Sequence, residues 1–129
     1  MREIKFRGKD LNTGEWVYGD LEIHRKDPRR LIHSYNDDGD YNRQYDVDEE
    51  TIGQFTGLQD KNGKDIYEGD IICFVDGLKR VNGEWIDNKH IYVVEYSGAA
   101  FSGVAGLSEV MDAVEVIGNI YDDPDLLKQ

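Results

Sequence analysis

The sequence predicts a mainly β protein in which short strands, separated by glycine turns, curl into a small barrel. The first observation is residues 53–72, where four turn signals lie between apolar runs that are too short for helices. The second is a period of two in the apolar residues near the N-terminus. With 129 residues and 14.8 kDa, the chain has the size of one average domain.

An N-terminal hairpin is expected first. Ile4 and Phe6 alternate with charged residues, which places apolar side chains on one face of a strand. A turn at residues 12–14 leads into a return strand, with Trp16 and Tyr18 among its buried residues.

Residues 25–50 form the most loop-like part of the sequence, although LIHSY within them indicates one short strand. Seven acidic residues and a glycine after position 36 raise the question of a calcium loop. Placing Gly39 at the sixth position of such a loop would require Ser34 at the first and Tyr45 at the twelfth, which does not fit the ligand pattern. We therefore expect a mobile acidic loop without a metal ion.

The central stretch carries the turn residues on which the fold prediction depends. Asn-Gly between two short apolar runs is typical of a type I′ hairpin turn. Glycine before Asp70 supplies a bend, and the Asp70 carboxylate can accept bonds from nearby backbone N–H groups. Residues 71–75 then form an apolar run that predicts a strand buried on both faces. The structural motif residues are Gly53, Gly57, Asn62, Gly63, Tyr67, Gly69, Asp70 and, near the C-terminus, Gly118.

A second hairpin is expected next, formed by residues 81–86, which contain another Asn-Gly pair, and by a β-branched strand at residues 91–96. The following residues 96–108 contain no charge, which favours a loop over the core or a surface that pairs with another copy of the chain. A helical turn with Ser108 as its N-cap is expected next. The candidate interface residues are Tyr96, Phe101, Val104 and Leu107.

Residues 116–120 echo residues 51–55 at an offset of 65, and Asp60 and Asp125 match at the same offset. The echo is either two strands kinked at glycine to turn a barrel corner or a coincidence. A closing helical turn is expected at Pro124, with Asp123 as its N-cap.

Charge and composition bear on the choice of partners. The net charge is −12, divided into +2 for residues 1–36 and −14 for the remainder, which argues against binding to phosphate backbones. The single cysteine, Cys73, lies in an apolar run and is expected to pack as a small hydrophobic residue. No signal peptide or membrane span is expected, so the sequence favours the cytoplasm.

No catalytic constellation is expected. His24, His33 and His90 are scattered and have no cysteine partner at metal-binding spacing. Gly98 and Gly103 have phosphate-loop spacing, but Val104 occupies the position that requires lysine. We therefore expect neither an enzyme nor a bound metal or cofactor.

The segments MREIKFRGKD, WVYGDL, TIGQFTGLQDKNGKDIYEGDII and VEVIGNIYDDPDLL resemble the YopX family of phage and prophage proteins. This resemblance implies a mostly β protein with a small SH3-like barrel and no established enzymatic activity. Combined with the element order, it suggests a single domain, with a hairpin and acidic loop over residues 1–50 and the barrel and C-terminal tail over residues 51–129.

Two functional hypotheses follow. The first is a non-catalytic accessory protein of the host bacterial cytoplasm. It would assemble with itself or bind a host or phage protein through exposed barrel edges and the uncharged residues 96–108. The second is a nucleic-acid-binding module that uses the basic N-terminal segment with Trp16 and Tyr18 as stacking groups. A variant of the first hypothesis is an acidic mimic of DNA.

Overall fold

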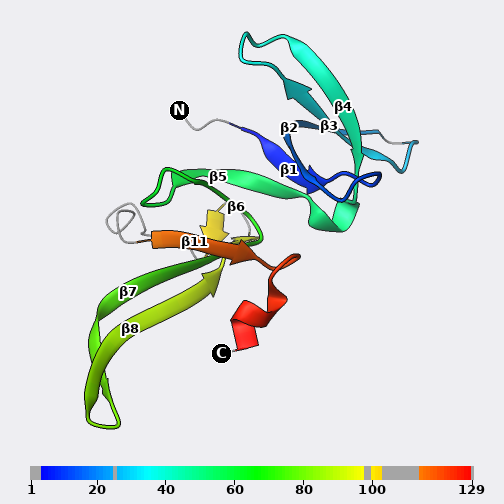
Figure 1. Ribbon diagram of the computed structural model, residues 1–129. Helices are drawn as coiled ribbons and strands as arrows, with labels where there is room; N and C mark the ends of the chain where they lie inside the picture. Colours follow the sequence, from blue (N-terminus) through cyan, green and yellow to red (C-terminus); the bar gives the residue numbers. More distant parts are fainter. Residues whose placement is uncertain (1–3, 25, 98–99, 103–113, 129) are drawn as a thin grey trace. The chain divides into compact units, whose positions relative to one another are not determined.

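The computed structural model describes residues 4–24, 26–97, 100–102 and 114–128 (Figure 1). Antiparallel strands dominate these residues, and the helical segments are two short 3₁₀ helices, η1 and η4, so the mainly β prediction is confirmed. The elements are β1 (Phe6–Lys9), β2 (Trp16–Ile23), β3 (Arg30–Tyr35), β4 (Tyr41–Val47), η1 (Glu49–Thr51), β5 (Gly53–Gln59), β6 (Asp65–Tyr67), β7 (Asp70–Val81), β8 (Glu84–Val93), β9 (Glu95–Ser97), β10 (Ala100–Ser102), β11 (Val114–Asn119) and η4 (Pro124–Lys128).

The chain divides into two compact units, Met1–Gly57 and Leu58–Gln129. The boundary lies inside β5, a few residues after the expected division between residues 50 and 51. Whether the two units behave as one domain stays a prediction.

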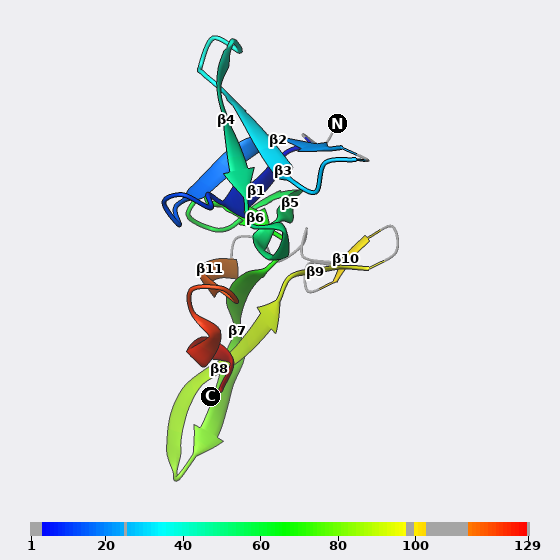
Figure 2. The same ribbon diagram turned by 90° about the vertical axis from the view of Figure 1, so that its right-hand side faces the viewer.

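In the first unit, the strand order is β4-β3-β2-β1-β5 (Figure 2). Its core is formed by Leu31, Ile32 and Val47, all nearly inaccessible to solvent. Gly8 lets β1 approach this core closely, because a Cβ atom there would lie only 3.1 Å from Val47 Cβ. The Thr51 hydroxyl accepts a 2.9 Å hydrogen bond from the Lys9 N–H, which ties η1 to β1.

The N-terminal hairpin prediction is confirmed, since β1 and β2 pair antiparallel, but the predicted apolar face is wrong. Ile4 is 66% exposed and Tyr18 is 48% exposed. Arg7 is buried instead, and its guanidinium carbon lies 4.5 Å from the centre of the Trp16 ring. A long basic side chain can cover an aromatic ring in this way, so simple alternation of apolar residues does not identify the buried face.

The predicted acidic loop is also wrong, because β3 and β4 form an antiparallel hairpin. The Asn36 side-chain oxygen accepts hydrogen bonds from the N–H groups of Asp38 and Asp40, at 3.0 and 2.9 Å. The three acidic residues 37, 38 and 40 therefore occupy an ordered turn, where their charges remain exposed.

In the second unit, β7 is the central strand of a sheet ordered β11-β7-β8. One face of this sheet packs on a core of Ile66, Ile72, Val94, Val114 and Val116. The strands of this sheet do not close into a barrel within the described residues, and the predicted SH3-like barrel is not confirmed.

The hairpin of β7 and β8 explains part of this difference. Among the described residues, β11 pairs with β7 as far as Phe74, and beyond that residue β7 and β8 continue as a two-stranded ribbon (Figure 1). Ile71 and Ile72 are fully buried, whereas Val75 is 41% exposed. The prediction of a strand buried on both faces is therefore correct only for the first residues of the apolar run.

Candidate interaction surface

The motif residues around Asn62 form a turn that is built on one carboxylate. Asp60 Oδ1 accepts hydrogen bonds from the N–H groups of Asn62 and Lys64, at 2.8 and 2.9 Å. Asp60 Oδ2 accepts a 2.9 Å bond from the N–H of Val116, which belongs to β11. Burial raises the pKa of Asp60, but these backbone N–H groups and the Lys64 charge outweigh it and hold the pKa below its usual value. Asp60 therefore joins the turn to the sheet.

The turn prediction at Asn62-Gly63 is confirmed, but its type I′ geometry is wrong. A type I′ turn needs positive φ at both central residues, and here Gly63 has φ 79° while Asn62 is not in the left-handed region. At the second Asn-Gly pair, Asn82 and Gly83 have φ values of 52° and 83°, and the flanking residues pair directly, as in a type I′ turn.

The predicted role of the Gly-Asp pair is confirmed. Gly69 has φ 92°, its N–H donates to the Val94 carbonyl and its carbonyl accepts from the Ile120 N–H. The buried Asp70 carboxylate accepts a 2.7 Å bond from the N–H of Tyr67, whose side chain is also buried. These residues fix the entry into β7.

The two glycines of the sequence echo differ in the structure. Gly118 lies at a register shift in β11, where a Cβ atom would come within 2.6 Å of an Asp123 carboxylate oxygen. Gly53 begins β5 opposite Arg7 and does not have positive φ. Gly57, four residues later, has φ 87°.

The predicted helical turn at Pro124 is confirmed as η4, and Asp123 directly precedes it.

Two of the predicted interface residues lie in a short antiparallel pair. Phe101 of β10 pairs with Tyr96 of β9 along the backbone (Figure 2). Val104, Leu107 and the predicted cap Ser108 lie outside the described residues. The interface prediction at residues 96–108 is therefore not tested.

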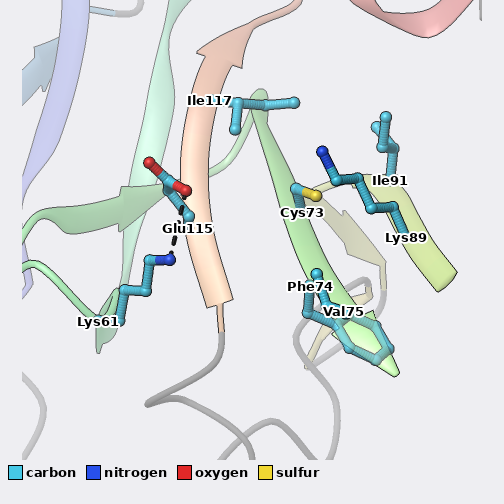
Figure 3. A pocket seen from close by; sticks show the side chains of 8 residues that line it. All are labelled: Lys61, Cys73, Phe74, Val75, Lys89, Ile91, Glu115 and Ile117. Carbon is cyan, nitrogen blue, oxygen red and sulfur yellow. Dashed lines mark ion pairs between the residues drawn. The ribbon is translucent and has the colours of Figure 1, made fainter. Parts of the chain in front are cut away.

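The face of the β11-β7-β8 sheet opposite the core contains a pocket of about 360 Å³ (Figure 3). Its apolar lining includes Ile91, Ile117 and the partly buried Cys73, while Lys61 and Glu115 form a 3.5 Å ion pair at its rim. Cross-strand partners share a face, and Cys73 is opposite both Ile91 and Glu115. The pocket therefore belongs to one continuous side of the sheet.

The same side continues along the β7–β8 ribbon as exposed apolar surface. Leu78 is 61% exposed and Trp85 is 63% exposed. Arg80 pairs with Trp85 across the ribbon, and its guanidinium carbon lies 5.5 Å from the centre of the Trp85 ring. On the opposite side, Val81 and Ile86 are each 41% exposed. The ribbon thus exposes apolar side chains on both faces, among charged ones, a feature that the sequence pattern does not reveal.

The first unit brings together two histidines that look scattered in the sequence. His33 Nε2 lies 2.7 Å and His24 Nε2 lies 3.1 Å from the Glu22 carboxylate. The side-chain hydrogen bond with His33 lowers the pKa of the half-buried Glu22 carboxyl. Within the residues described, no three potential ligands gather around one metal site.

Trp16, a proposed stacking group for nucleic acid, is in contact with two basic side chains of its own chain. Arg7 and Lys9 lie 4.5 and 5.4 Å from its ring centre. The alternative hypothesis of nucleic-acid binding stays a prediction. No helix in the described ranges has both the length and the apolar character needed to cross a membrane.

Comparison with known proteins identifies the family. A family model described as YopX protein matches residues 5–128. Among solved structures, the chain is similar to protein EF1440 from Enterococcus faecalis, with 24% identity and a TM-score of 0.61, covering 98% of this chain and 99% of that one. No curated protein matches. Because the family model spans nearly the whole sequence, as the motifs indicated, the chain belongs to the YopX family.

Proposed function

We propose that this protein is a non-catalytic accessory protein of phage or prophage origin, acting in the host cytoplasm, and that it works by self-association through the β7–β8 ribbon. The observation that carries this proposal is the ribbon's exposed apolar surface beside the open edge of β8. Clustered apolar side chains on a protruding ribbon favour burial against another surface.

The strand edge supports the same proposal. β8 is the outer strand of its sheet, and no described strand pairs with its second edge. Such an edge presents a row of backbone N–H and C=O groups that can pair with another strand. β8 has 10 residues, and its exposed side chains Trp85 and Ile86 lie on opposite faces. Its edge therefore offers a partner both backbone hydrogen bonds and apolar contacts.

The mass in solution tests this function. Light scattering over a wide concentration range should give a mass that rises from 14.8 kDa toward twice that value. Leu78→Ser should weaken the association, because it removes an exposed apolar side chain from the ribbon. Leu11→Ser is a matched control, since Leu11 is 64% exposed in the first unit. A mass of 14.8 kDa at every concentration would reject self-association.

A further inference from the structure

The outer edge of β8 is regular along its whole length. The register between β7 and β8 shifts between Val75 and Leu78, while β8 advances only from Lys89 to Asp87. The extra residue of this bulge therefore lies on β7, and β8 itself is not interrupted. A second strand could pair with residues 84–92 without meeting an irregularity.

The sequence of β8 is complementary to itself in one antiparallel register. When Asn88 lies opposite Asn88 of a second copy, Asp87 lies opposite Lys89, and Lys89 lies opposite Asp87. These opposite charges lie on the same face of the sheet as the pocket, because side chains two residues apart share a face. Among the described residues, neither Asp87 nor Lys89 takes part in an ion pair.

Neighbouring registers lack this complementarity. A twofold axis at Asp87 would place two aspartates opposite each other and Trp85 opposite Lys89. An axis at Lys89 would place two lysines opposite each other and leave Asp87 opposite Ile91. Like charges directly opposite each other destabilise a strand pair, so the axis at Asn88 is favoured over both.

The favoured register also gives the pocket an occupant. With the axis at Asn88, Trp85 of one copy lies opposite Ile91 of the other. Ile91 lines the pocket, and its neighbour across the sheet is Cys73, also in the lining (Figure 3). Tryptophan is enriched among the residues that dominate binding energy at interfaces.

We infer that two copies pair through β8 in an antiparallel arrangement centred on Asn88, joining two three-stranded sheets into one of six strands. Trp85 of each copy covers the pocket of the other. This inference rests on the proposed self-association and adds its register and its partner surface. The interface is isologous: both copies contribute the same surface, and a twofold axis relates them.

A disulfide at the axis tests the register directly. In a Cys73→Ser background, Asn88→Cys should form a covalent dimer under mild oxidation, because directly opposite Cα atoms are about 4.5 to 5.5 Å apart. Ile86→Cys is the matched control, since its two copies would be about 13 Å apart in this register. Equal cross-linking at both positions, or none at Asn88→Cys in an associating protein, would overturn the register.

Charge reversal provides a second test. Asp87→Lys and Lys89→Asp each place like charges opposite each other in both symmetric pairs, so each should weaken self-association about tenfold. A mixture of the two variants should form a heterodimer, because every pair then joins lysine to aspartate. The double variant should associate like the original chain. Unchanged homodimers of the single variants would reject this register while leaving self-association standing, whereas a monomeric original chain would reject both proposals.

Discussion

The β5–β6 hairpin and the β7–β8 hairpin each have an Asn-Gly pair at the turn but are stabilised in different ways. At the β5–β6 turn, a buried carboxylate from Asp60 organises the backbone and also bonds to β11. At the β7–β8 turn, Asn82 and Gly83 both adopt left-handed conformations and residues 81 and 84 pair directly. The first turn depends on tertiary contacts, whereas the second is specified locally.

The difference separates structural residues from surface that is available for binding. The turn at Asp60 adjoins the core of the second unit, so changes there should alter global stability. The ribbon beyond Phe74 lies outside that core and has exposed apolar residues, so changes there should alter association. Substitutions at matched positions of the two hairpins can test this division.

The largest effect is expected for Asp60→Ala. Three backbone N–H groups lose their acceptor, and Asp60 is only 7% exposed, so the free energy of unfolding should fall by about 3 kcal/mol. Urea denaturation followed by tryptophan fluorescence measures this change. Asp125→Ala is the control at the matching position of the sequence echo, where the side chain is 90% exposed. An equal loss for both variants would contradict a specific role for Asp60.

A pH dependence should follow from the same carboxylate. Its folded pKa lies below the ordinary value of 3.8, so its stabilising contribution is complete above 3.8 and is lost as the pH falls through the folded pKa. Asp60→Asn keeps an oxygen for the turn but cannot titrate. The original chain and Asp60→Asn should therefore differ less in unfolding free energy in acid, as urea titrations at several pH values would show. A constant difference would contradict the assignment.

Sequence patterns identified the positions of turns more reliably than their types. Both Asn-Gly pairs are turns, but the type at Asn62 is decided by Asp60 and by its bond to Val116, 56 residues away along the chain. Local sequence contains no information on that contact. Similarly, the charge of the acidic residues after Asn36 favours a loop, whereas the turn there is ordered by the Asn36 side-chain oxygen, which accepts bonds from the Asp38 and Asp40 N–H groups.

The candidate surface was missed for a related reason. The sequence predicts strands near residues 81–86 and 91–96. Only the sheet order shows that β8 is one strand over residues 84–93 and that no described strand pairs with its outer edge. The self-complementary order of Asp87, Asn88 and Lys89 was a usable signal in the sequence. It acquires meaning only when β8 is known to be an edge strand.

A smaller effect is expected from alanine at the turn glycines. Gly63 and Gly83 have φ values of 79° and 83°, and a Cβ atom at either position would meet no other atom within 4 Å. Each substitution therefore introduces backbone strain alone, about 1 kcal/mol. Gly63→Ala should lower the global unfolding free energy, whereas Gly83→Ala should increase hydrogen exchange only near the ribbon tip. Identical exchange patterns would remove the distinction between the two hairpins.

The smallest effect separates the two asparagines. Asn82 has φ 52°, a conformation that asparagine adopts more readily than alanine, so Asn82→Ala should destabilise the ribbon tip by about 0.5 kcal/mol. Asn62 is not left-handed and contributes its backbone N–H to Asp60, which alanine retains, so Asn62→Ala should leave stability nearly unchanged. Amide hydrogen exchange at residues 81 and 84 compared with residues 60 and 64 measures the contrast. A larger loss at Asn62 than at Asn82 would mean that the asparagine side chain, rather than the Asp60 carboxylate, holds the β5–β6 turn.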